Sequence, residues 1–160
     1  MKLVSLVLLC FFTMTVYCQD SVKIYNPTAD AGMDLASAIQ SASDQQKHVL
    51  VQVGGNWCSW CVRLHGFFNS NQQIDSILKA DYILLRINYS PENKNPEVLA
   101  KLDYPQRFGF PVLLVLDANG RRIHTQDSGF LEEGKGYDAE KIKRFLLTWN
   151  TSAVNPKNYH

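Results

Sequence analysis

Two cysteines, Cys58 and Cys61, are the residues of this chain whose type and spacing most directly indicate chemistry. They lie in the stretch GNWCSWC at residues 55–61, where an apolar run that predicts a buried strand gives way to glycine and then to a predicted helix. Two intervening residues, wound as the first turn of a helix, bring the two sulfurs within disulfide reach. The stretch therefore predicts a pair that can alternate between dithiol and disulfide.

The predicted helix start is expected to favour a thiolate at Cys58. Unpaired backbone N–H groups and the positive end of the helix dipole both stabilise negative charge there. In such motifs the pKa of the cysteine falls from about 8.5 to roughly 3.5–7.5. Because the thiolate is the attacking species, we expect Cys58 to attack and Cys61 to resolve the mixed disulfide.

The first 18 residues have the layout of a secretory signal peptide. Lys2 precedes an apolar stretch that is shorter than the roughly 20 residues of a membrane-spanning helix. Cleavage after Cys18 leaves Cys58 and Cys61 as the cysteines of the mature chain, and a lipidated Cys18 or an uncleaved anchor are the alternatives. We therefore expect a secreted or periplasmic protein, in which a lone pair three residues apart indicates chemistry more than scaffolding.

Charge and composition narrow the classes of partner. The chain of 160 residues is 46% hydrophobic and 19% charged, which is ordinary for one globular domain. It has 16 Lys and Arg against 15 Asp and Glu, and loss of Lys2 with the signal peptide leaves the formal charges balanced. No basic face is implied, so we expect no nucleic-acid partner and no membrane contact unless Cys18 is lipidated.

Hydrophobic periodicity predicts an α/β fold with a mixed sheet and helices on both faces. Domain boundaries are expected as a signal peptide over 1–18, a lead-in over 19–33, one domain over 34–149 and a polar tail over 150–160. Predicted strands cover 48–53, 82–87, 112–116 and 121–125, with a possible edge strand at 22–25, and the first two read as buried. Predicted helices cover 34–42, 58–68, 74–78, 97–102 and 139–149.

The chain resembles the thioredoxin superfamily over residues 34–149. The resemblance rests on Trp57 before the C-x-x-C pair, on Phe110-Pro111 before the third strand, on Gly129 after a hairpin, and on the closing helix. It implies a thioredoxin fold and a dithiol–disulfide oxidoreductase acting on protein or peptide thiols and disulfides. An unidentified electron donor or acceptor is implied, with no cofactor beyond the Cys58–Cys61 disulfide and no metal.

The same resemblance assigns roles to residues around the pair. It implies that Trp57 shields the site, that Pro111 is a cis-proline lying against the disulfide, and that the backbone of Phe110 pairs with substrate. Trp60, in the first helical turn beside the reactive sulfur, is expected to be exposed and to contact substrate. The loop between the second strand and Pro111 is longer than in a minimal thioredoxin, which indicates a part in recognition.

Two departures from the superfamily pattern affect the expected chemistry. Gln52 stands six residues before Cys58, where the family carries a buried acid, and an amide cannot accept the proton of Cys61. The dipeptide Ser59-Trp60 matches none of the pairs that assign a direction of electron flow. With no histidine between the cysteines and an apolar Phe110, we favour a disulfide reductase.

Other interpretations of the same residues stay open. The pair can be a structural disulfide, half of a zinc site with His65 as its nearest helper, or part of a non-catalytic module that binds client peptides beside Pro111. A metal-handling protein is the least supported class, because His48, His124 and His160 form no pair in the sequence. His65 itself is expected on the helix surface, and Arg63 is expected as a solvated charge with a possible electrostatic effect on the thiolate.

Overall fold

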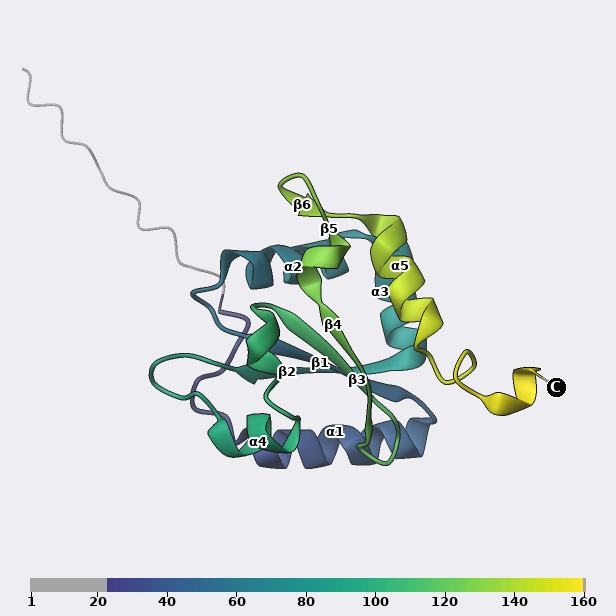
Figure 1. The fold of residues 1–160 in the computed structure, drawn as a ribbon, viewed down its shortest axis with the longest axis horizontal. Helices are drawn as coiled ribbons and strands as arrows, with labels where there is room; N and C mark the ends of the chain where they lie inside the picture. The colour runs from purple at the N-terminus through teal and green to yellow at the C-terminus, as the bar shows by residue number, and fades with distance from the viewer. Residues whose placement is uncertain (1–22, 160) are drawn as a thin grey trace, which may run out of the picture.

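A four-stranded mixed sheet in the order β2-β1-β3-β4 runs through the centre of the protein (Figure 1). The computed structural model describes residues 23–159, so the predicted signal peptide and Cys18 lie outside the described residues. β1 pairs parallel with β2 and antiparallel with β3, and β3 pairs antiparallel with β4. The strands are β1 (His48–Gly54), β2 (Tyr82–Asn88), β3 (Val112–Leu116) and β4 (Arg122–Asp127).

Burial across the sheet follows the strand order. Every residue of the central strands β1 and β3 is buried, as their apolar sequences predict. β2 was expected to be a buried strand, but four of its seven residues are only half-buried. The reason is its place at the edge of the sheet, where one neighbouring strand is absent. Because β2 lies at the edge, it can carry a half-buried charged residue, Arg86.

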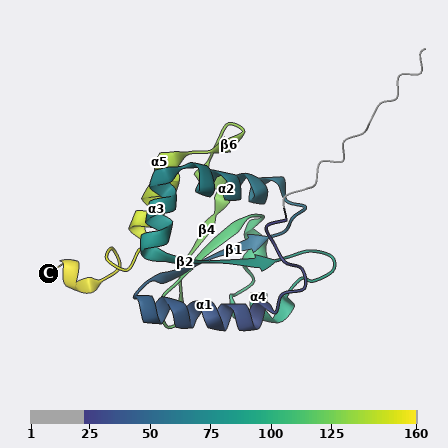
Figure 2. The ribbon, with the colours of Figure 1, turned by 180° about the vertical axis from the view of Figure 1, so that it is seen from behind.

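Helices cover both faces of the sheet, which confirms the predicted fold class (Figures 1 and 2). One core cluster packs under α1 (Ala31–Gln45) and α4 (Pro96–Lys101). The other packs under α2 (Ser59–Ser70), α3 (Gln72–Asp81) and α5 (Ala139–Thr148). Alternate residues of β1 and β3 face opposite clusters, as a pleated strand requires. No helix within residues 23–159 is long and apolar enough to cross a membrane.

Side-chain caps move two helix starts ahead of the predicted positions. α1 begins at Ala31 rather than at Asp34, because the Asp30 carboxylate accepts the N–H groups of Gly32 and Met33 at 2.9 and 3.0 Å. α3 likewise begins before the predicted start at residue 74, after a cap by Asn71. Apolar spacing locates the buried face of a helix, whereas the cap determines its first turn.

The segment that precedes α1 is held by a side chain instead of a sheet. The prediction placed an edge strand at 22–25, and the described part of it, residues 23–25, contains no strand. Asn56 replaces the missing partner: its Oδ1 accepts the N–H groups of Ile24 and Tyr25 at 2.8 and 3.0 Å, and its Nδ2 donates to the Tyr25 carbonyl at 2.8 Å. In Figure 2 this purple segment passes the ends of β1 and β2 on its way to α1.

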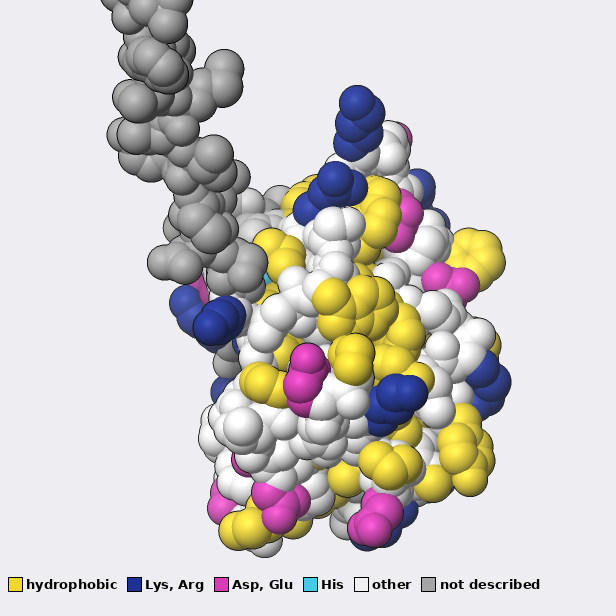
Figure 3. All heavy atoms as spheres, turned by 90° about the vertical axis from the view of Figure 1, so that its left-hand side faces the viewer, with side chains coloured by type: hydrophobic (Ala, Val, Ile, Leu, Met, Phe, Trp, Pro, Cys, Tyr) yellow, Lys and Arg dark blue, Asp and Glu magenta, His cyan; other side chains and the backbone are white. Residues whose placement is uncertain are grey.

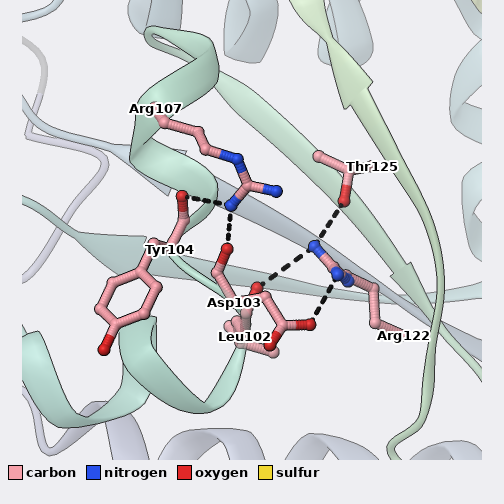
Figure 4. Close-up of polar contacts among 6 residues, drawn as sticks. All are labelled: Leu102, Asp103, Tyr104, Arg107, Arg122 and Thr125. Atoms are coloured by element: carbon pink, nitrogen blue, oxygen red, sulfur yellow. Dashed lines mark hydrogen bonds and ion pairs between the residues drawn. The ribbon is translucent and has the colours of Figure 1, made fainter.

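The loop that leads to Pro111 is pinned by two arginines (Figure 4). Asp103 and Tyr104 adopt left-handed backbone angles, with φ of 56° and 55°, before the short 3-10 helix η1 (Pro105–Phe108). Arg107 donates to both of their carbonyls, at 2.9 Å for Tyr104, and Arg122 of β4 pairs with the Asp103 carboxylate at 2.6 Å. These contacts fix the approach of the chain to Pro111.

The segment between β4 and α5 contains short regular elements. It forms η2 (Ser128–Leu131) and a small hairpin of β5 (Glu132–Glu133) and β6 (Gly136–Tyr137). The predicted polar tail contains η3 (Pro156–Tyr159), whose Asn158 side chain donates to the Ser152 carbonyl at 2.7 Å.

Candidate active site

The two cysteines lie where β1 ends and α2 begins, and a disulfide joins them with their Cα atoms 5.2 Å apart. Cys58 is the N-cap of α2: its backbone is extended, and its Sγ accepts the backbone N–H of Cys61 at 3.1 Å. The predicted helix start is therefore confirmed to within one residue. A thiolate at Cys58 would lie at the N-terminus of α2, where the helix dipole and free backbone N–H groups stabilise negative charge.

Exposure distinguishes the two sulfurs. Cys58 is 4% exposed and Cys61 is fully buried, with no exposed surface. Cys58 is therefore the residue of the pair that retains surface open to an incoming sulfur. This asymmetry fits the predicted division into an attacking and a resolving cysteine.

Aromatic side chains form one wall beside Cys58. Trp57 is exposed, and its indole N–H donates to the Tyr89 carbonyl at 2.7 Å. The Trp57 ring meets the Phe110 ring edge-on with centroids 5.4 Å apart, and the Tyr89 ring stacks on Phe110 with centroids 4.8 Å apart. Gly55 is required for this packing, because a β-carbon there would clash with the Trp57 ring.

Phe110 and Pro111 lie beside the cysteines, at the start of β3. The peptide bond between them is cis. Phe110 packs against the small cluster formed by Tyr25, Cys58 and Cys61. Because Val112 pairs with Val53, Pro111 lies next to the end of β1 that carries the cysteines.

Trp60 differs from its prediction. We expected an exposed side chain, but it is half-buried, with its ring edge-on to Tyr137 of β6 at 5.5 Å. The guanidinium of Arg63, one helical turn further, lies 4.8 Å from the centre of the same ring. The hairpin of β5 and β6 therefore covers part of the Trp60 indole. Its position could not be read from the sequence.

A hollow of about 720 Å³ opens on the outer side of Trp57. Pro27, Trp57, Tyr89 and Pro91 line it together with polar residues of the segment that follows β2. This segment belongs to the long loop between β2 and Pro111, for which the sequence analysis predicted a role in recognition. Figure 3, which views the side that lies at the left of Figure 1, shows hydrophobic side chains gathered on this face among scattered charges.

A polar layer lies behind Cys61, where the superfamily pattern expects an acid. Gln52 is fully buried, and its Nε2 donates weakly to the Cys61 carbonyl at 3.4 Å. Arg86 lies opposite Gln52 in the β1–β2 register and contacts His65 Nδ1 at 3.0 Å. Burial lowers the pKa of Arg86, and burial together with the Arg86 charge lowers the pKa of His65.

Four residues of this site were missed by sequence reasoning: Tyr25, Asn56, Arg86 and Tyr89. Arg86 had a signal, because it is the one charged residue within the apolar strand sequence YILLRI. Tyr89 also had a signal in the sequence, because it follows the carboxyl end of a parallel strand, where open α/β sheets place their binding sites. Tyr25 and Asn56 had none, because they meet only through the tertiary fold.

His48 and His124, which were weighed as metal ligands, are both in contact with Trp149. His48 Nδ1 bonds to the Trp149 carbonyl at 2.8 Å, and His124 stacks on the Trp149 ring at 4.2 Å. His160 lies outside the described residues. Within residues 23–159, no three His, Cys, Asp or Glu side chains come together as a metal site.

Comparison with known proteins identifies the family. A family model described as thioredoxin-like matches residues 28–118, which is more than half of the chain. The protein therefore belongs to the thioredoxin-like family, as the sequence resemblance implied.

Solved structures agree with this fold. The chain is similar to a disulphide isomerase from Xylella fastidiosa Temecula1, with a TM-score of 0.70 and 22% identity over 79% of this chain and 96% of that one. It is also similar to a DsbH oxidoreductase, with a TM-score of 0.52 and 20% identity over 69% of this chain and 77% of that one. No curated protein sequence matches the chain. At these identities the likeness concerns the fold.

Proposed function

We propose that this protein is an extracytoplasmic thiol–disulfide oxidoreductase that reduces disulfides of proteins or peptides through Cys58 and Cys61. The observation that carries the proposal is the disulfide at the start of α2, with the sulfur of Cys58 bound by a helix N–H. The names of the two similar structures, a disulphide isomerase and an oxidoreductase, fit this reaction class. The signal-like residues 1–18 support the extracytoplasmic location.

The reaction has two displacement steps. First, the Cys58 thiolate attacks a client disulfide: a bond forms between Cys58 Sγ and one client sulfur, the client S–S bond breaks, and the second client sulfur leaves as a thiolate. Cys61 then attacks Cys58 Sγ, which forms the Cys58–Cys61 disulfide and releases the first client sulfur. The client gains two electrons and the enzyme loses two, so a separate dithiol donor must restore the enzyme.

The site supplies what each step needs. The α2 N-terminus stabilises the attacking thiolate, because its backbone N–H groups and dipole act on Cys58 Sγ without reorganising. The hollow beside Trp57 can hold the client chain next to its disulfide. The absence of histidine between the cysteines supports the reducing direction, with a potential nearer about −270 mV than about −120 mV.

Cysteine variants test the proposal in a disulfide-reduction assay on a model peptide. We expect Cys58→Ser to reduce activity to the uncatalysed rate, because no attacking sulfur remains. We expect Cys61→Ser to accumulate a client–Cys58 mixed disulfide that mass spectrometry detects. Ser70→Ala, at the far end of α2, serves as the control with unchanged activity.

The same variants distinguish a second candidate function. The hollow beside Trp57 favours a module that binds clients without changing their disulfides. Full activity of Cys58→Ser would contradict the enzyme proposal. Inactive wild-type protein, combined with unchanged client affinity in the double Cys→Ser variant, would establish the binding module instead.

A further inference from the structure

Three buried polar atoms without a hydrogen bond of normal geometry belong to residues grouped behind Cys61: Tyr25 Oη, Gln52 Oε1 and Arg86 Nε. Buried polar atoms in proteins nearly always have a partner, and a redox or catalytic role is one recognised reason for an exception. The structure contains the disulfide, in which Cys61 Sγ carries no charge and no proton. Opening of that bond would create a new polar group in this place.

Tyr25 is held so that its hydroxyl borders the sulfur of Cys61. Its backbone N–H and carbonyl both bond to the Asn56 side chain, and its side chain is 3% exposed in one cluster with Cys58 and Cys61. A β-carbon built on Gly54 would lie 2.7 Å from Tyr25 Oη and would clash with Cys61 Sγ. Hydroxyl and sulfur therefore both border the space that Gly54 leaves empty.

Arg86 adds a positive charge to the same place. It makes no ion pair with a carboxylate among residues 23–159, and its hydrogen-bond partner is His65. The groups that shift the pKa of Tyr25 are, beyond burial itself, Arg86, Gln52 and Tyr137, and no described carboxylate is among them. A half-buried guanidinium without a carboxylate partner, such as that of Arg86, can stabilise a thiolate that forms nearby.

We propose that Tyr25 is a positioning residue for Cys61: once the disulfide opens, its hydroxyl donates a hydrogen bond to Cys61 Sγ and, with the charge of Arg86, stabilises the thiolate there. The proposal rests on the proposed exchange function. It gives this chain a group that stabilises the Cys61 thiolate beside Gln52, where the superfamily carries an acid. Sequence position could not indicate it, because Tyr25 reaches the site from a segment 33 residues before Cys58.

The role concerns the resolving step. As Cys61 Sγ attacks Cys58 Sγ, the bond from Cys58 to the client sulfur breaks and the Cys58–Cys61 bond forms. The client sulfur leaves with the electron pair and takes up the proton that Cys61 has lost. Tyr25 keeps its own proton throughout, since burial raises its pKa more than Arg86 and Gln52 lower it. It therefore acts as a donor and not as a base.

Tyr25→Phe tests the inference, because it removes the hydroxyl and keeps the ring. In equilibrium with a glutathione buffer series, we expect about a tenfold shift of the purified protein toward the disulfide, or a potential about 30 mV more negative. We also expect slower resolution of a mixed disulfide, with its pH midpoint moved upward. Arg86→Gln should shift both readouts in the same direction, which gives a second variant that leaves Tyr25 in place.

Tyr82→Phe is the matched control. Tyr82 is also 3% exposed, but its hydroxyl donates to the Leu146 carbonyl at 2.6 Å within the other core cluster. We expect it to leave the potential and the pH midpoint unchanged. Equal shifts in Tyr25→Phe and Tyr82→Phe, or no shift in Tyr25→Phe whatever Arg86→Gln shows, would overturn the inference while the exchange function stands. A wild-type pair that does not exchange with glutathione would instead refute the proposed function.

Discussion

Arg86 connects the sheet to α2, the helix that begins at the reactive pair. It occupies an otherwise apolar strand, is half-buried, and contacts His65 on α2 at 3.0 Å. His65 was expected on the helix surface, and it is in fact half-buried between that surface and the guanidinium. Burial lowers the pKa of His65, and the positive charge of the adjacent Arg86 lowers it further.

A residue-scale prediction follows for Arg86→Gln. Removal of the charge should raise the pKa of His65 only part of the way to its ordinary value of 6.5, because burial is the larger cause of the shift. An NMR titration of the His65 ring measures this. Since the folded pKa lies below the unfolded one, His65 lowers stability as the pH falls below about 6.5, and less so in the variant. An unchanged His65 titration would contradict the contact.

At the scale of elements, the corner between α2 and α3 positions the helix that carries the cysteines. Asn71 is at once the C-cap of α2 and the N-cap of α3. Its Oδ1 accepts the N–H groups of Gln73 and Ile74, both at 3.1 Å. One side chain therefore ends one helix and starts the next at a fixed angle.

We predict that Asn71→Ala lowers the free energy of unfolding by about 1 kcal/mol, the usual value of an N-cap. Denaturant unfolding measures it. Ser76→Ala in the same helix is the control: it removes a hydroxyl bound only to the Gln72 carbonyl, and its effect should stay within about 0.5 kcal/mol. Equal effects of the two variants would mean that the cap does not hold the corner.

The sequence predicted which helices and strands form better than it predicted where each one begins. Apolar spacing located all four strands of the main sheet and the five α-helices. It failed at helix starts, which depend on Asp30 and Asn71, and at the 22–25 segment, which Asn56 holds. Caps and side-chain tethers are single polar residues, so they leave no periodic pattern in the sequence.

At the scale of the whole molecule, the fold and the redox potential are linked. The disulfide belongs to a small cluster that shares Phe110 with one core cluster and Trp60 with the other, and Cys61 is fully buried. A folded state that favours the disulfide makes the pair harder to reduce, and a folded state that favours the dithiol makes it an oxidant. Stability of the two redox forms therefore reports the direction of electron flow.

If the protein is a reductase as proposed, its oxidised form should have the higher free energy of unfolding. Thermal or denaturant unfolding with and without a strong dithiol reductant measures the difference. A control with Cys58→Ser and Cys61→Ser together should show no response to the reductant. A more stable reduced form would contradict the reducing direction and mark an oxidant.

The sequence by itself determined the α/β architecture, the place of Cys58 and Cys61 at a strand-to-helix turn, and the family resemblance. Those features depend on local spacing, because period and motif are properties of neighbouring residues. Only the tertiary structure decided that Trp60 packs against Tyr137, that Tyr25 packs with Cys61, and that Arg86 lies opposite Gln52. These contacts join segments far apart in the chain, so they depend on how the layers pack and not on any local pattern.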